Sequence, residues 1–226
     1  MELVPVERLT PERRRALTRT ALVEAAAEVF ARRGFHAASL DEIAETAGFT
    51  RGAIYSNFSG KEDLLLAVLD QYTDRQLEAF AEVLDRTSGS STAGQASAAA
   101  GVWGESQREN PSWALLSLEM RLYALRNSEF RRRLAAFERR QQERIAEFIE
   151  AETRRQGVVL KMSASDLADI GRAVSDGLSQ MTVLDPDRSE HYRRIAGVFF
   201  GFIDSSIVTP GSDAPAKPKP RRNSRG

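Results

Sequence analysis

The sequence predicts an all-α fold in two unequal parts. Apolar residues recur at steps of three and four over most of the chain, which is the spacing of amphipathic helices. Glycines divide the first sixty residues into short segments, whereas the helical segments that follow are long. No stretch shows the alternation typical of a strand, and there is no internal repeat. We therefore expect a three-helix N-terminal domain over residues 1–62, a larger helical domain over 63–209, and a tail over 210–226.

The first helix is expected from Pro11 to Arg33. Thr10 is a suitable N-cap, and a proline in the first turn loses no helical hydrogen bond. Gly34 follows the last apolar position, and glycine is the residue that most often ends a helix in the left-handed conformation.

Two short helices are expected next, within residues Ser39 to Phe58. Ser39 with Glu42 forms the pattern of a capping box, in which serine caps the helix start and glutamate bonds back to it. Gly48 allows a tight turn, and Thr50 is placed to cap a second helix of about seven residues. Two short helices joined by a glycine-containing turn are typical of a helix-turn-helix that binds DNA.

The rest of the chain is expected to be helical up to the tail. The expected helices cover residues 61–85, 96–109, 111–126, 128–156, 164–184 and 186–207. The tail from residue 210 to 226 is rich in Pro, Lys, Arg and Ser and nearly lacks apolar residues, so we expect it to be disordered.

Composition excludes several classes of function. There is no cysteine among the 226 residues, and the two histidines are far apart, so neither a metal site nor a thiol nucleophile is expected. No nucleophile–base pair or phosphate-cradling glycine loop is present, so we expect neither an enzyme nor a cofactor. No segment has the length of a membrane span or the apolar core of a signal peptide, which favours a cytoplasmic protein.

Charge is distributed unevenly although the net charge is zero. Residues 1–61 carry +1, residues 62–209 carry −5, and residues 210–226 carry +4. Four arginines, at positions 13, 14, 15 and 19, precede the apolar part of the first helix. A local basic face of this kind is sufficient for contact with phosphates, whatever the global charge. The basic tail would add non-specific attraction to DNA or act only as a solubilising extension.

Residues 20–69 resemble the N-terminal domain of the TetR (tetracycline-repressor) family of transcriptional regulators. The matching runs are VFARRGF at 29–35, SLDEIA at 39–44, AGFTRGAIYSNF at 47–58 and KEDLL at 61–65. Order, spacing and residue types agree over about fifty residues, less than a quarter of the chain. Asn57 departs from the pattern, since the family often has a bulkier Tyr or His there.

The resemblance implies a set of DNA contacts. Phosphate contacts would come from Ser39, Tyr55 and Lys61. The helix would be positioned by Thr50 and Asn57, and the residues nearest base edges would be Arg51, Gly52 and Ser56. Among these, the guanidinium fork of Arg51 can donate twice to one guanine. The structural alternatives are that Ser39 is only a helix cap, that Tyr55 is a core aromatic residue, and that Arg51 is a solvated charge.

The resemblance also implies a homodimer whose C-terminal domain binds a small molecule. Two apolar stripes at helical spacing would form a four-helix interface: Leu167, Ile170, Val174 and Leu178 on one helix, and Ile195, Phe199 and Ile203 on the next. A ligand pocket would be lined by members of the set Trp103, Trp113, Met120, Tyr123, Phe137 and Met181. The alternative for both sets is ordinary packing within one chain.

These observations favour a repressor that a small-molecule effector releases from a palindromic operator. The alternative keeps the DNA-binding domain but gives the C-terminal part only dimerisation or a protein partner, and it predicts a C-terminal core without a void. The sequence leaves open the effector, the operator, the regulated genes, and the choice between repression and activation.

Overall fold

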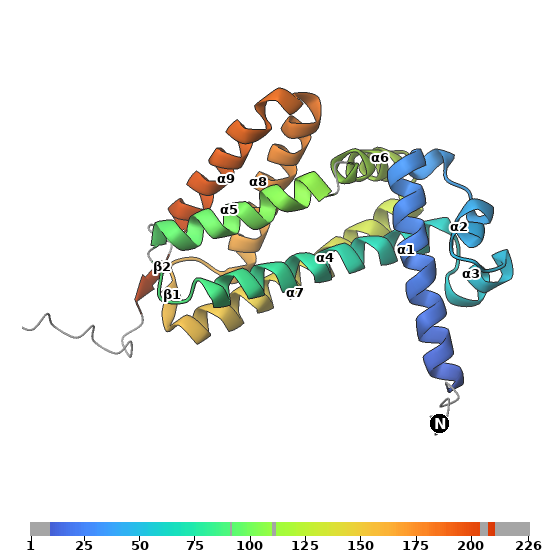
Figure 1. The fold of residues 1–226 in the computed structure, drawn as a ribbon, viewed down its shortest axis with the longest axis horizontal. Coiled ribbons are helices and arrows are strands. Elements are labelled where there is room, and N and C mark those ends of the chain that lie inside the picture. Colours follow the sequence, from blue (N-terminus) through green and yellow to red (C-terminus); the bar gives the residue numbers. More distant parts are fainter. Residues whose placement is uncertain (1–9, 91, 110–111, 204–207, 211–226) are drawn as a thin grey trace, which may run out of the picture.

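The computed structural model describes residues 10–90, 92–109, 112–203 and 208–210. Within these ranges the chain is almost entirely helical, as the sequence predicts (Figure 1). The elements are α1 (Pro11–Ala37), α2 (Leu40–Thr46), α3 (Arg51–Asn57), α4 (Lys61–Arg86), α5 (Thr92–Glu109), α6 (Trp113–Arg126), α7 (Ser128–Gln156), β1 (Val158–Leu160), α8 (Ala164–Leu184), a 3₁₀ turn η1 (Pro186–Arg188), α9 (Ser189–Phe202) and β2 (Val208–Pro210).

The first helix begins and ends where the sequence predicts. The Thr10 side chain accepts a hydrogen bond from the Arg13 amide at 3.2 Å. Gly34 has φ +74°, so the regular helix is interrupted there although the element as a whole runs to Ala37. The left-handed conformation at Gly34 turns the chain so that Phe35 enters the core, where its side chain is 2 % exposed.

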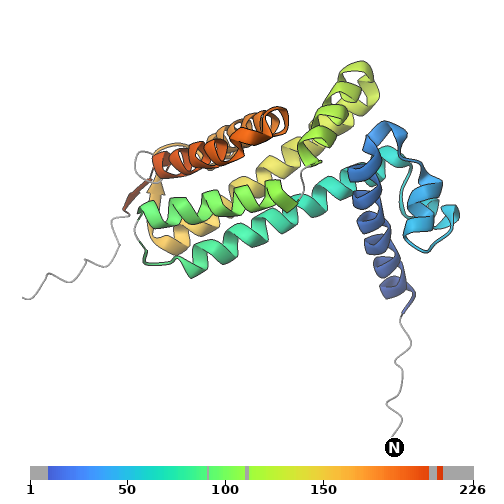
Figure 2. The ribbon, with the colours of Figure 1, turned by 45° about the horizontal axis from the view of Figure 1, so that its top comes forward.

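The helices of the larger part form an elongated arrangement. Helices α4 and α7 run alongside each other from the three-helix unit toward the far end of the molecule, while α5, α8 and α9 cover them there (Figures 1 and 2). Helix α6 lies between α1 and this assembly, and it contacts α1, α7 and α8. The predicted domain boundary between residues 62 and 63 falls inside the first turn of α4, so one continuous helix joins the two parts.

The expectation that no strand forms is wrong at one place. Strand β1 pairs antiparallel with β2, with Val159 opposite Thr209. Gly157 ends α7 in the left-handed conformation, and the valines that follow suit an extended chain. Because the partner strand lies about fifty residues further on, no hairpin signal in the sequence marks the pair.

The larger of two apolar clusters among the described residues extends from the three-helix unit into the larger part. Its most deeply buried side chains include Phe30 of α1, Ile54 of α3, Leu64 of α4 and Phe130 of α7. Burial of large side chains from all of these helices in one cluster fixes how the three-helix unit sits on α4, α6 and α7.

The predicted tail is described only at its first residue. Pro210 ends β2, and residues 211–226 lie outside the described part of the chain. Among the described helices, none combines the length and the apolar character that a membrane span requires.

Candidate DNA-binding surface and adjoining cavity

Helix α2 is capped by serine, but the capping box is not reciprocal. The Ser39 Oγ accepts a hydrogen bond from the Glu42 amide at 3.1 Å. The Glu42 carboxylate does not act as the predicted second half of the box; it bonds to Arg32 at 2.9 Å and to Arg33 at 3.2 Å. Hydrogen bonds from these two guanidinium groups lower the pKa of Glu42. Glutamate therefore ties the start of α2 to the end of α1.

The turn between α2 and α3 has the geometry that the sequence predicts. Gly48 has φ +73°, in the left-handed region where glycine carries no steric penalty. The Phe49 amide donates to the Ala44 carbonyl at 2.8 Å, which satisfies an acceptor at the end of α2 and closes the turn.

Helix α3 is anchored by two apolar side chains that face inward. Ile54 is fully buried and Phe58, which follows the helix, is 3 % exposed. The prediction that Thr50 caps this helix is wrong, because its side chain makes no capping hydrogen bond. The Thr50 hydroxyl therefore accepts no hydrogen bond from the amides in the first turn of α3.

The outer face of α3 presents Arg51 and Tyr55. The Tyr55 residue is 53 % exposed, so it is not a core aromatic residue. Arg51 Nη2 donates to the Tyr55 hydroxyl at 3.1 Å, and its Nη1 donates to Asp41 at 3.0 Å. Sequence reasoning missed Asp41, which lies ten positions earlier on α2. The two side chains implied to contact DNA are therefore held together on an exposed surface.

The carboxyl end of α3 is held from behind by α1. Arg15 Nη2 donates to the Ser56 carbonyl at 2.9 Å, and Arg19 Nη1 donates to the Asn57 carbonyl at 3.2 Å. Cations are favourable at this end of a helix because its unpaired carbonyls carry partial negative charge. Arg15 and Arg19, two of the four arginines that suggested a phosphate-binding face, thus hold α3, the helix expected to enter the DNA groove, against α1.

The polar side chains at the end of α3 are partly engaged with their own helix. The Ser56 hydroxyl donates to the Ala53 carbonyl at 2.9 Å, and Asn57 Nδ2 donates to the same carbonyl at 2.8 Å. Asn57 Oδ1 is buried and accepts no hydrogen bond. Gly52 leaves space on the outer face, since a β-carbon there would contact only the Thr50 hydroxyl, at 3.6 Å.

Lys61 lies where α4 begins, against the end of α1. Its Nζ donates to the carbonyls of His36 at 3.1 Å and Ala38 at 2.9 Å, and it lies 4.8 Å from the Phe35 ring centroid. Burial lowers the pKa of Lys61. An ammonium group has three donors, so one remains for another acceptor.

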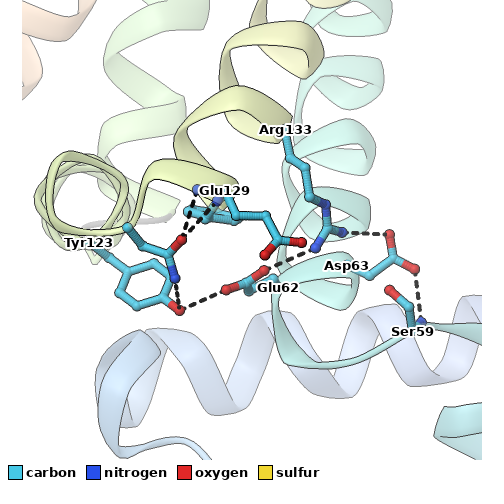
Figure 3. Close-up of polar contacts among 8 residues, drawn as sticks. Ser59, Glu62, Asp63, Tyr123, Glu129 and Arg133 are labelled. Atoms are coloured by element: carbon cyan, nitrogen blue, oxygen red, sulfur yellow. Dashed lines mark hydrogen bonds and ion pairs between the residues drawn. The ribbon is translucent and has the colours of Figure 1, made fainter.

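A polar network connects the first turn of α4 to α6 and α7 (Figure 3). The Tyr123 hydroxyl donates to Glu62 at 2.7 Å, and Arg133 Nη1 donates to the other oxygen of Glu62 at 2.9 Å. Arg133 also contacts Asp63, whose carboxylate accepts a hydrogen bond from the Ser59 amide at 3.0 Å. Hydrogen bonding to Glu62 raises the pKa of Tyr123. These bonds fix the start of α4 relative to the larger part.

A second link joins α6 directly to the end of α1. Glu119 Oε2 accepts a hydrogen bond from the Phe35 amide at 2.7 Å. A β-carbon at Gly34 would lie 2.7 Å from Glu119 Oε1, so the carboxylate can come this close only because residue 34 is glycine. Sequence reasoning missed Glu119, since nothing in its local pattern distinguishes it from other carboxylates.

The larger part contains a cavity of about 470 Å³ that opens to solvent. Four residues of the predicted pocket set line it: Trp103, Trp113, Met120 and Phe137. The other two lie elsewhere: Tyr123 belongs to the network at the start of α4, and Met181 is 51 % exposed on α8. Inside the cavity the Tyr72 and Trp113 rings stack with their centroids 3.8 Å apart, and burial raises the pKa of Tyr72.

The predicted interface residues of α8 and α9 fall into different environments. Leu167 and Leu178 are buried within the chain. Val174 packs against the apolar cluster that contains Leu178, and Phe199 and Ile203 line the cavity. Ile170 and Ile195 face solvent and are about 40 % exposed. Four other apolar side chains on these two helices are more exposed than Ile170 and Ile195: Met181, Leu184, Val198 and Phe202. The solvent-facing apolar surface thus lies partly beside the predicted stripes.

The short exposed helix α3, which follows the capped helix α2 after a tight turn, has the arrangement of a DNA-binding helix-turn-helix. Residues 22–68 match the family model described as bacterial regulatory proteins, tetR family. The N-terminal part of the chain therefore carries a DNA-binding domain of the kind found in tetR-family regulators.

Relatives support this assignment over different lengths. The transcriptional activator FasR of Mycolicibacterium smegmatis is 44 % identical over 66 residues, which cover 29 % of this chain and 30 % of FasR. The match thus spans less than a third of that relative. A putative TetR-family regulator from Rhodococcus sp. aligns over 85 % of this chain and 99 % of its own, with a TM-score of 0.65 and 23 % identity. FadR of Bacillus subtilis, solved with stearoyl-CoA, aligns over 83 % of this chain and 98 % of its own, with a TM-score of 0.59 and 18 % identity.

Proposed function

We propose that the protein is a homodimeric repressor that leaves a palindromic operator when a small molecule occupies the cavity. The observation that carries the proposal is the placement of the cavity. Its walls include α4, α6 and α7. Glu119 of α6 bonds to Phe35 of the three-helix unit, and Glu62 bonds the start of α4 to Tyr123 of α6 and Arg133 of α7. A molecule that favours one arrangement of these walls would favour one position of α3, and that difference would change operator affinity.

Contacts with DNA are proposed for the residues of the helix-turn-helix. Ser39, Tyr55 and Lys61 bind phosphates, Thr50 and Asn57 position α3, and Arg51, Gly52 and Ser56 lie nearest base edges. The exposed, paired arrangement of Arg51 and Tyr55 supports this assignment. Reading a guanine requires Arg51 to exchange its surface ion pair with Asp41 for the base, and such exposed pairs are weak.

Binding of an effector is supported by the void itself. An alternative in which the C-terminal part only dimerises predicts a filled core, and the cavity favours the effector instead. FadR of Bacillus subtilis, with the same fold, was solved with stearoyl-CoA. FasR is named an activator, but repression is the mode we propose here because it needs only occupancy of the operator.

The test of effector release is a thermal-shift screen of small molecules followed by operator binding by fluorescence anisotropy. A molecule that stabilises the protein is expected to weaken operator affinity about 5- to 150-fold, the usual range of coupling between two sites. Ligands that stabilise the protein strongly but leave operator affinity unchanged would contradict the proposal.

Dimerisation is proposed through the exposed apolar surface of α8 and α9. Val198 is 68 % exposed and Phe202 is 56 % exposed, and the two lie four positions apart on α9, so they share one face of the helix. Helices α8 and α9 lie at a distance from α3 (Figure 1), so a partner that packs on them would leave both copies of α3 free to bind DNA.

Val198→Asp is expected to weaken the dimer about thirtyfold or more, because a charge would be placed where apolar side chains meet. Sedimentation velocity over a dilution series measures the change. The matched control is Val159→Asp, at a valine of β1 that is 55 % exposed outside this surface. If Val198→Asp left the dimer affinity unchanged, or if both substitutions weakened the dimer equally, α8 and α9 would not be the interface.

A further inference from the structure

The cavity extends along two neighbouring helices. Its lining residues extend from Leu69 to Leu84 along α4 and from Leu134 to Gln156 along α7. At the helical rise of about 1.5 Å per residue, these spans correspond to roughly 22 Å and 33 Å. We call this elongated cavity the channel. The shape therefore suits an extended molecule better than a compact one.

Most of the channel wall is apolar or aromatic. The rings of Tyr72 and Trp113 lie at the end toward α6, and Phe80, Phe148 and Phe199 lie further along. Val158 and Leu160 of β1 contribute to the opposite end. A ligand that fills the channel would gain most of its affinity from burial of apolar surface.

Four charged residues in the wall form a closed ring, which we call the ionic ring. Arg121 of α6 contacts Asp176 at 2.5 Å and Glu138 at 3.9 Å. Arg172 of α8 contacts the same two acids, bonding to Glu138 and lying 3.7 Å from Asp176. Each arginine is thus shared between both carboxylates, and the net charge of the ring is zero.

The remaining charged residue among the described lining residues is also neutralised. Glu152 accepts hydrogen bonds from Arg155 at 2.7 Å and 2.9 Å and from Gln156 at 2.6 Å. The pKa of Glu152 is lowered by the bonds from Arg155, which fits a carboxylate that stays charged and paired. Among the lining residues that the structure describes, every cation therefore has a carboxylate partner.

From the shape and the charge pairing together, we propose that the cavity takes elongated, uncharged and mostly apolar molecules and discriminates against anions. The proposal rests on the proposed role of the cavity as the effector site. An anionic ligand would be desolvated in an apolar channel without a free counterion, and burial of an unpaired charge is strongly unfavourable. The ionic ring acts as the selecting element, because its arginines are occupied by their own acids.

The experiment compares hexadecanol with palmitate, which have chains of equal length, on the full-length dimer at pH 8 without DNA. Calorimetric titration from cyclodextrin complexes gives both affinities. We expect hexadecanol to bind at least tenfold more tightly than palmitate. Shortening the alcohol should weaken binding by up to about fourfold per methylene, the value for full burial of apolar surface.

The decisive variant is Asp176→Asn, which is nearly isosteric and leaves two arginines facing one carboxylate. We expect palmitate to bind at least tenfold more tightly to this variant than to the wild type, with little change for hexadecanol. Arg121→Gln should shift palmitate in the opposite direction. The matched control is Asp187→Asn, the same chemical change at an exposed position of η1 outside the cavity lining, where both affinities should stay unchanged.

Three outcomes would overturn the proposal: binding of neither probe, palmitate binding as tightly as hexadecanol to the wild type, or no gain in palmitate affinity for Asp176→Asn. The proposed function is judged separately, by operator affinity in the presence of the bound alcohol. If hexadecanol bound without any change in operator affinity, the proposed ligand class would be supported, but the proposal that the ligand releases the operator would be contradicted.

Discussion

Ile54→Ala is expected to destabilise the α2–α3 region by about 2–5 kcal/mol, the range for removal of a buried aliphatic side chain. Ile54 is fully buried, and no other residue within α3 is buried. Helix α3 has seven residues, too few to be stable without tertiary contacts. Hydrogen exchange followed by mass spectrometry should show faster exchange in residues 39–58, with α7 and α8 unchanged, together with loss of DNA binding.

The control for this prediction is Ser56→Ala on the same helix. The serine is exposed and its hydroxyl bonds only to its own helix and to its neighbour Asn57, so we expect a stability change within about 0.5 kcal/mol. If Ile54→Ala left exchange in residues 39–58 as slow as in the wild type, the packing that we assign to α3 would be wrong.

Glu119→Ala is expected to separate effector binding from operator release. The substitution removes a charge-assisted hydrogen bond between α6 and the Phe35 amide, and bonds of this kind contribute about 1.5–3 kcal/mol. The effector-induced loss of operator affinity should shrink by about 10- to 150-fold if this bond carries the coupling, while the effector still binds. Operator titrations with and without a saturating effector measure the change.

The matched control is Glu105→Ala. Glu105 lies on α5, its side chain is 66 % exposed, and its contact with Arg108 is 3.9 Å long. Its removal should leave the coupling intact. A full effector response in Glu119→Ala would show that the network of Tyr123, Glu62 and Arg133 suffices, or that α6 has no part in the coupling.

The sequence predicts best what depends on local chemistry. Thr10, Gly34, Ser39 and Gly48 act where capping and turn preferences place them, and Ile54 faces inward as its spacing from Phe58 requires. These features depend on a few adjacent residues, so the sequence contains the information that fixes them.

Contacts between distant segments could not be predicted in the same way. Asp41 beside Arg51, Glu119 beside Phe35 and the ionic ring all depend on how separate helices approach one another. The pairing of β1 with β2 has the same origin. Periodicity also left each apolar stripe of α8 and α9 undecided between the chain's own core and a partner, and the structure places Leu167 and Leu178 in the core.

The central claim is that residues 39–58 read DNA, and selection of bound sequences from a random duplex library tests it most directly. The wild-type protein is expected to enrich a palindrome whose half-sites lie about one helical turn apart, with affinity that falls steeply as salt increases. Arg51→Ala should lose about 1–3 kcal/mol of discrimination at one base pair in each half-site. Enrichment of no sequence by a folded dimer, or of the same sequence with equal affinity by Arg51→Ala, would contradict the claim.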